Sequence, residues 1–227
     1  MVKRSTHEFR GSARVGIVGG LADTARRHHR LFQQLAEEIP PEPDDWDGAA
    51  YGTWLEETEG KRTAAIDAAA ITIIFAAAAA EGYIYDFAAR ALGDLFVEKN
   101  LDKLSTQSKW IIVPRLVANH EIKTDSRAYQ LLILLTKARN EIVHPKTENM
   151  MILNKEQLLR RVEHAARLPK RADEAIAALD ALGNEASKFD SFWAKSYFAL
   201  PGRTQSVGTI AGQIVLGDHE QDGTGAS

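Results

Sequence analysis

Three side chains suited to acid–base and anion chemistry lie within six residues, at Arg139, Asn140 and His144. An arginine is a permanent cation that offers a planar fork of hydrogen-bond donors to an anion such as phosphate. A histidine titrates near neutrality and can take or give a proton, and an asparagine can orient that imidazole or a substrate. Pro145 follows directly and disfavours the helical conformation of His144. The stretch predicts a catalytic edge at a helix terminus.

The element that must position these side chains is an apolar helix, expected from Asp125 or Ser126 to Val143. Asn140 and His144 lie one turn apart, whereas Arg139 is roughly 140° round from a helical His144. We expect a frayed last turn and the long arginine side chain to bring the two groups towards one ligand. Apolar residues repeat at helical spacing and predict a core-facing stripe of Leu131, Leu134, Leu135, Ala138 and Ile142. Asn140 and His144 fall nearly opposite this stripe, on a face that also carries Ile133 and Lys137 and suits an interface.

This pattern resembles a motif of the HEPN family (higher eukaryotes and prokaryotes nucleotide-binding domain). The motif is an Arg, a polar residue, three more residues and a His, on a helix that follows a long apolar helix. Two further segments carry the resemblance. Ala80–Phe87 is similar to the Glu-bearing part of the first core helix, and Ser105–Val117, with Lys109 and Trp110, to the connecting stretch. The resemblance implies an all-α fold, a HEPN-like antiparallel helical bundle, here with extra N- and C-terminal helices.

The activity that the resemblance implies is that of a metal-independent endoribonuclease, with no cofactor and no metal. RNA supplies its own 2′-hydroxyl nucleophile, so the protein must move protons and stabilise charge on phosphorus. His144 is then a general base or acid, Arg139 stabilises the phosphorane oxygens, and Asn140 orients the imidazole or the substrate. Glu81 is expected to face the Arg and the His and to fix a histidine tautomer or polarise the site. The products would be a 2′,3′-cyclic phosphate and a 5′-hydroxyl.

A homodimer is implied as well, because efficient cleavage needs one group that takes a proton and another that gives one. The motif supplies one histidine, and a symmetric dimer supplies two at a composite site. The chain resembles the solitary or defence-associated members, which include toxins and phage-defence effectors, and this leaves room for a regulatory partner protein. Toxin members paired with a nucleotidyltransferase carry a modified Tyr two residues after the His; Pro145-Lys146 stand there instead, so that route of neutralisation is not expected.

Composition narrows the setting. The chain has no cysteine, so a disulfide framework and a thiolate zinc site are excluded, which suits a cytoplasmic protein. The longest apolar stretch, Ala68–Ala80, is shorter than the ~20 residues of a membrane span. We expect a buried helix there and no membrane. The net charge of −3 argues against a uniformly basic surface for nucleic acid.

The charges are nevertheless segregated along the chain. Residues 1–30 carry seven Lys or Arg and two acids, residues 37–59 nine acids and no Lys or Arg, and residues 155–171 six bases and two acids. Solvated helix faces and an acidic loop are the default interpretation, and patches near an RNA site are the alternative.

The remaining chain divides into an N-terminal helix and acidic loop (1–60), the HEPN-like core (61–150), C-terminal helices (151–200) and a flexible tail (201–227). Val15–Gly20 is expected to be a flexible entry to the first helix rather than a phosphate loop. Five aromatic residues near the C-terminus favour core packing over base stacking: Phe189, Phe192, Trp193, Tyr197 and Phe198. Further helices are expected over residues 20–38, 63–98, 106–117, 154–168 and 171–182, and a short strand over 207–216.

Two other functions stay open. A non-catalytic helical module could bind RNA, nucleotide or protein, with Arg139 paired to an acid and His144 interacting with the helix dipole. A metal-dependent hydrolase is disfavoured, because no paired His motif at ligand spacing occurs on one helix face. The adjacent His28 and His29 point to different sides of a helix and do not suit a shared metal.

Overall fold

A computed structural model describes residues 11–44, 48–144 and 155–198, and within these ranges all regular structure is helical. The expected all-α class is therefore confirmed. Trp46, Pro145, the expected strand over 207–216 and the tail lie outside the described residues. The helices are α1 (Gly11–Glu37), α2 (Ala49–Leu92), α3 (Asp94–Asn100), α4 (Thr106–Ala118), α5 (Arg127–Val143), α6 (Lys155–Ala186) and α7 (Ser191–Tyr197).

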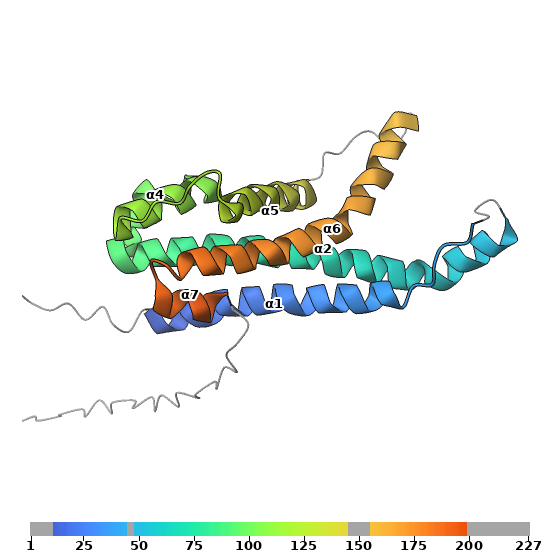
Figure 1. Ribbon diagram of the computed structural model, residues 1–227, viewed down its shortest axis with the longest axis horizontal. Coiled ribbons are helices and arrows are strands. Elements are labelled where there is room, and N and C mark those ends of the chain that lie inside the picture. The colour runs from blue at the N-terminus through green and yellow to red at the C-terminus, as the bar shows by residue number, and fades with distance from the viewer. Residues whose placement is uncertain (1–10, 45–47, 145–154, 199–227) are drawn as a thin grey trace, which may run out of the picture.

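The central element is α2, and α1, α4, α5 and α6 all pack against it. Figure 1 shows α1 along one side of α2 and the pair α4 and α5 on the opposite side, with α6 running beside α2. The packed surface of α2 is unusually rich in small side chains, which let neighbouring backbones approach closely. Its buried alanines are Ala65, Ala68, Ala69, Ala76, Ala77, Ala79, Ala80, Ala88 and Ala89.

The bounds of α2 differ from the expected helix over 63–98 at both ends. At its N-terminal end the helix begins after Gly48, well before residue 63. The helix ends at Gly93, where φ is +86°, a conformation that glycine adopts without a Cβ clash. Residues 94–100 therefore form the separate helix α3.

The N-terminal region is more helical than expected. The segment expected as a flexible entry, Val15–Gly20, lies inside α1, because a glycine weakens a helix by about 1 kcal/mol without ending it. The second half of the expected acidic loop belongs to α2. Trp54 of this segment packs against its neighbours: its indole donates to the carbonyl of Pro40 at 3.0 Å, and the Arg62 guanidinium lies 5.0 Å from the centre of its ring.

The expected break at Pro169 does not occur, and α6 is continuous from Lys155 to Ala186. A proline inside a helix removes one backbone hydrogen bond. That loss is offset by burial of the following turns, because the side chains at Ala172, Ala175, Leu179 and Leu182 are all in the core. Figure 1 shows α6 changing direction along its length.

Within the described residues, α2 is the one helix long and apolar enough to cross a membrane by length and composition. Its most apolar 18-residue window has a mean hydropathy of 1.9, and half of that window is buried inside the bundle. The buried helix expected over Ala68–Ala80 is confirmed, because this stretch lies within α2 and none of its residues is exposed. The central helix of a soluble bundle meets the same criterion, so the helix is compatible with the expected cytoplasmic location, which stays a prediction.

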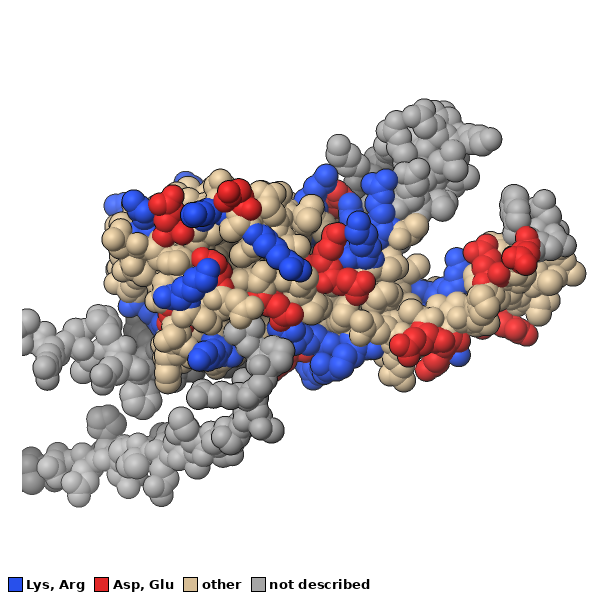
Figure 2. Space-filling view, viewed as in Figure 1, with Lys and Arg blue, Asp and Glu red and all other residues tan. Residues whose placement is uncertain are grey.

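The segregated charges have two different roles. The described acidic side chains between residues 37 and 59 are exposed, including Glu37, Glu38, Glu56 and Glu57, as the solvated interpretation predicts. Figure 2 shows them on the projecting end of the molecule where α2 begins. The basic side of α1 is partly used within the fold, because Arg26 pairs with Asp180 at 2.6 Å and His29 with Asp173 at 2.7 Å, both on α6.

Core packing of the C-terminal aromatic residues is confirmed, with one exception. Tyr197 and Phe198 are fully buried, and the Phe198 ring centre lies 4.9 Å from that of Tyr83 on α2. Phe189 and Trp193 pack against the same core. The exception is Phe192, whose residue is 76% exposed because it lies on the outer side of the short helix α7.

A buried charge network joins α2 to the start of α7. Arg90 donates to Asp86 and to Asp190, each at 2.8 Å, and the Tyr83 hydroxyl donates to Asp190 at 3.0 Å. Burial lowers the pKa of Arg90, but the hydrogen bonds and charges of Asp190 and Asp86 outweigh it, so the net pKa is raised. Burial and the charge of Asp190 together raise the pKa of Tyr83. The arginine therefore stays charged and the tyrosine stays neutral.

A second polar cluster predicts acid-dependent stability. Glu185 on α6 is bonded to the His120 imidazole at 2.9 Å and accepts from the Lys188 ammonium at 2.6 Å. Burial raises the pKa of Glu185, but the hydrogen bonds to Lys188 and His120 lower it by more. The net pKa is therefore below the usual 4.5. A carboxyl whose pKa is lowered by folding stabilises the protein above its unfolded pKa, and this stabilisation is lost as pH falls through the folded pKa.

We therefore expect Glu185→Gln to be less stable than the wild type at pH 7, with the difference shrinking below the usual carboxyl pKa of 4.5. Urea unfolding at a series of pH values between 7 and the acid limit of folding measures this difference. The exposed Glu121→Gln serves as a control with no comparable pH effect. A difference that stays constant across the series would contradict the role of Glu185.

Candidate functional site

The helix α5 begins and ends close to its expected bounds. Ser126 is its N-cap and accepts a hydrogen bond from the Tyr129 amide, and His144 closes it at the other end. Its core-facing side is rotated relative to the expected stripe, because α5 packs against both α2 and α6. Leu132 is fully buried, whereas Leu134, expected in the core, is 44% exposed.

The other stripe residues face the core as expected, fully in the case of Leu135 and Ala138 and partly in the case of Leu131 and Ile142. The side opposite the core carries the residues predicted for it, since Ile133, Lys137, Asn140 and His144 are all exposed.

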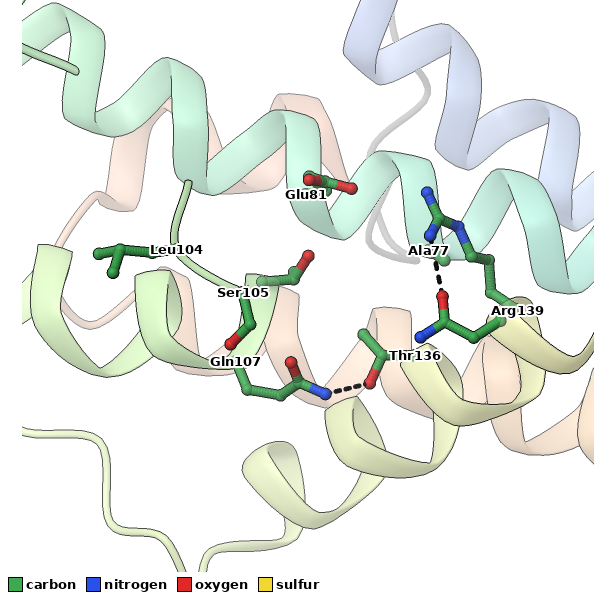
Figure 3. Close-up of a pocket in the computed structure, with 9 residues that line it drawn as sticks. Ala77, Glu81, Leu104, Ser105, Gln107, Thr136 and Arg139 are labelled. Carbon is green, nitrogen blue, oxygen red and sulfur yellow. Dashed lines mark hydrogen bonds between the residues drawn. The ribbon is translucent and has the colours of Figure 1, made fainter. Parts of the chain in front are cut away.

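A pocket with a volume of about 230 Å³ lies where α5 faces α2 and the first turn of α4. Its lining residues come from α2, α4 and α5 and from the residues just before α4 (Figure 3). Three of the four predicted site residues, Glu81, Arg139 and Asn140, line this pocket together; His144 is not among its lining residues. The full lining is Ala77, Glu81, Leu104, Ser105, Thr106, Gln107, Thr136, Arg139 and Asn140.

Arg139 is the cation of the pocket, and its side chain is half-buried. Its guanidinium donates to the Asn140 side-chain oxygen at 2.9 Å. Among the described residues no carboxylate forms an ion pair with it; the neighbouring Glu141 pairs with Arg171 of α6 instead. A guanidinium has five N–H donors, so most of those of Arg139 are available to a ligand.

Glu81 has a different partner from the one that the sequence suggested. Its carboxylate lies 3.9 Å from the ammonium of Lys109, whose side chain is only 4% exposed. The same ammonium lies 5.9 Å from the centre of the Tyr85 ring. The negative charge of Glu81 is thus paired with Lys109. Glu81 is therefore not the counter-ion of Arg139.

His144 lies at the solvent-exposed end of α5, outside the pocket. Its backbone amide donates to the Asn140 carbonyl at 2.9 Å, so the last turn is hydrogen-bonded. We expected this turn to be frayed, and that expectation was wrong. It is five positions after Arg139, which corresponds to about 7.5 Å along a helix axis. Within one chain, the pocket therefore brings Arg139 together with Asn140 and not with His144.

Two polar residues of the pocket, Gln107 and Thr136, were missed by the sequence analysis. The Gln107 amide nitrogen donates to the Thr136 hydroxyl oxygen at 2.5 Å, which links α4 to α5. A signal for Thr136 existed, since it precedes Arg139 by three residues and Asn140 by four, the spacing of neighbours on a helix surface. Gln107 had no such signal, because only the packing of α4 against α5 brings it there.

No group of three or more His, Asp or Glu side chains in the described part of the chain is placed to hold a metal ion. Comparison with known proteins adds no relative: no family model matches the sequence. No curated protein and no solved structure matches it either. What the geometry itself defines is an all-helical bundle with a polar pocket between α2, α4 and α5 that contains both Arg139 and Glu81.

Proposed function

We propose that the protein is a HEPN-like metal-independent endoribonuclease, with its active site on α5 and completed by a second copy of the chain. The observation that carries the proposal is Arg139: a half-buried cation, without a carboxylate partner among the described residues, in a pocket with Asn140 and Glu81. A cation held in a pocket without a counter-ion favours an anionic ligand. The motif that supplies it resembles HEPN nucleases, whose substrate is RNA, so the anion we propose is a phosphodiester.

The chemistry assigns one task to each side chain. An imidazole removes the proton of the 2′-hydroxyl, whose oxygen attacks phosphorus, and a second imidazole gives a proton to the departing 5′-oxygen. Arg139 stabilises the added negative charge on the phosphorane oxygens. Asn140 orients the substrate or the guanidinium to which it is bonded. The reaction involves no oxidation or reduction, and the products carry a 2′,3′-cyclic phosphate and a 5′-hydroxyl.

The second imidazole is the reason for proposing a homodimer. His144 lies outside its own pocket, on the exposed end of α5, where it is free to reach a neighbouring copy. The same exposed side carries Ile133, and Val143 is exposed at the end of the helix. A two-fold axis beside this face would place one His144 from each copy near one RNA strand.

The test is cleavage of total RNA and tRNA by the purified full-length protein in excess EDTA. We expect cleavage to persist in EDTA and to leave cyclic-phosphate ends, because the residues and the 2′-hydroxyl supply all the chemistry. Analysis of the 3′ ends by their sensitivity to phosphatase before and after acid treatment checks this. Cleavage that requires a divalent cation would contradict the proposal, and a monomer in sedimentation at micromolar concentration would contradict the composite site.

A binding module without catalysis is the second candidate, and the position of His144 outside the pocket favours it. The pocket alone offers Arg139 and Asn140 as donors and no proton-transfer imidazole. Binding of RNA or nucleotide that is lost in Arg139→Ala, with no cleavage by the wild type, would support this function. A role as a toxin or phage-defence effector, with a regulatory partner protein, belongs to the ribonuclease proposal, and growth arrest on expression of the wild type would support it.

A further inference from the structure

The hydrogen bonds of Thr136 fix the direction of its hydroxyl proton. Its oxygen lies 2.8 Å from the Leu132 carbonyl and 3.0 Å from the Ile133 carbonyl. Both partners are acceptors only, so the single hydroxyl proton is directed at the α5 backbone. Towards any third group, the Thr136 oxygen can act only as an acceptor.

This constraint fixes the orientation of Gln107. The amide contacts Thr136 at 2.5 Å, and the contact must use the amide nitrogen, because two acceptors facing each other would repel. The Gln107 carbonyl oxygen is then turned away from Thr136. Figure 3 shows that oxygen on the side of the pocket where Ser105 and Glu81 lie.

The same logic orients Asn140 at the other end of the pocket. Its carbonyl oxygen accepts from Arg139 at 2.9 Å, so its amide nitrogen is the free end. The pocket therefore offers donors from Arg139 and Asn140 on α5, and a neutral acceptor from Gln107 on α4. A ligand that matches this arrangement carries an anion at one end and an N–H donor at the other.

We propose that the pocket binds a nucleotide, with its phosphate on Arg139 and the exocyclic amine of its base on the Gln107 carbonyl oxygen. The inference rests on the proposed action on RNA and adds a base preference, for cytosine or adenine over uracil. The cytosine amine presents N–H to an acceptor. The only ring N–H of uracil lies between two carbonyl oxygens, which repel the fixed Gln107 oxygen, so uracil is disfavoured.

Binding of cytidine and uridine monophosphates to the full-length protein tests the inference, with isothermal titration calorimetry as the readout. For the wild type we expect cytidine monophosphate to bind about tenfold more tightly, the effect of one hydrogen bond of ordinary strength. In Thr136→Val the hydroxyl is lost, the Gln107 amide can present either end, and the preference should disappear. Thr136→Ser keeps the hydroxyl and should keep the preference.

Arg139→Ala provides the matched comparison, because it should weaken both nucleotides by the same factor and leave their ratio unchanged. Since the readout is a ratio within one variant, a partial loss of folding does not imitate the result. Equal binding of the two nucleotides by the wild type, no binding of either, or a preference that survives in Thr136→Val would each overturn the inference.

The outcome is separable from that of the ribonuclease proposal. A cytosine preference that depends on Thr136, in a protein that cuts no RNA, would support the base site and refute catalysis. RNA cleavage that depends on His144, in a protein without any base preference, would support catalysis and refute the base site.

Discussion

Replacing His144 with alanine is expected to lower RNA cleavage by about two to four orders of magnitude, the usual contribution of a general acid or base. The imidazole is exposed at the end of α5 and contributes no core packing, so the free energy of unfolding should change by less than about 0.5 kcal/mol. Single-turnover cleavage of an RNA oligonucleotide measures the first quantity, and urea unfolding the second. A loss of cleavage without a loss of stability is the signature of catalysis.

Lys137→Ala is the matched control, because Lys137 is exposed on the same side of α5 as His144. It should change cleavage far less than His144→Ala. Arg139→Ala should reduce cleavage by about two to three orders of magnitude, as removal of one stabilising donor group does elsewhere. If cleavage survives in His144→Ala and is lost in Arg139→Ala, the pocket is the site and the assignment of the proton-transfer group is wrong.

Arg90→Ala is expected to destabilise the protein by about 3–5 kcal/mol, because it leaves two acidic side chains buried without their cation. The Arg90 side chain is 21% exposed, and those of Asp86 and Asp190 are more deeply buried still. The change would weaken the attachment of α7, since Asp190 precedes that helix. The midpoint and slope of urea unfolding, compared with the wild type, measure the effect.

Arg115→Ala is the contrasting variant. Arg115 pairs with Glu121 at 3.0 Å, but its side chain is 59% exposed, so we expect a change of about 1 kcal/mol or less. Similar losses for Arg90→Ala and Arg115→Ala would show that burial does not govern the strength of the Arg90 network.

Helix existence was largely predictable from local patterns, and helix ends were predictable where a local device sets them. Ser126 accepts a hydrogen bond from the backbone amide three residues later, and α5 starts where the helix was expected to begin. Pro169 and the glycines near residue 16 were misleading for the opposite reason. Both are unfavourable in a helix, but their cost is smaller than the packing free energy of the long helices that contain them.

The site was predictable in its components and less so in its arrangement. The spacing of Arg139, Asn140 and His144 on one helix correctly placed Asn140 and His144 on the exposed side. The joint pocket of Glu81 with Arg139 agrees with the expectation, but the ion pair of Glu81 with Lys109 depends on how α4 packs against α2 and has no signature in local sequence. Gln107 was invisible for the same reason.

The alanine-rich surface of α2 determines which mutations the fold tolerates. Alanine has almost no side chain to lose, so truncation, the commonest cause of core damage elsewhere, removes little at Ala76, Ala77 or Ala80. Enlargement has the larger effect, because a longer side chain at a buried position must displace its neighbours. Ala77 also lines the pocket, so growth there would fill the ligand space as well as strain the bundle. The sequence of α2 is therefore freer to vary on its exposed side than at these buried alanine positions.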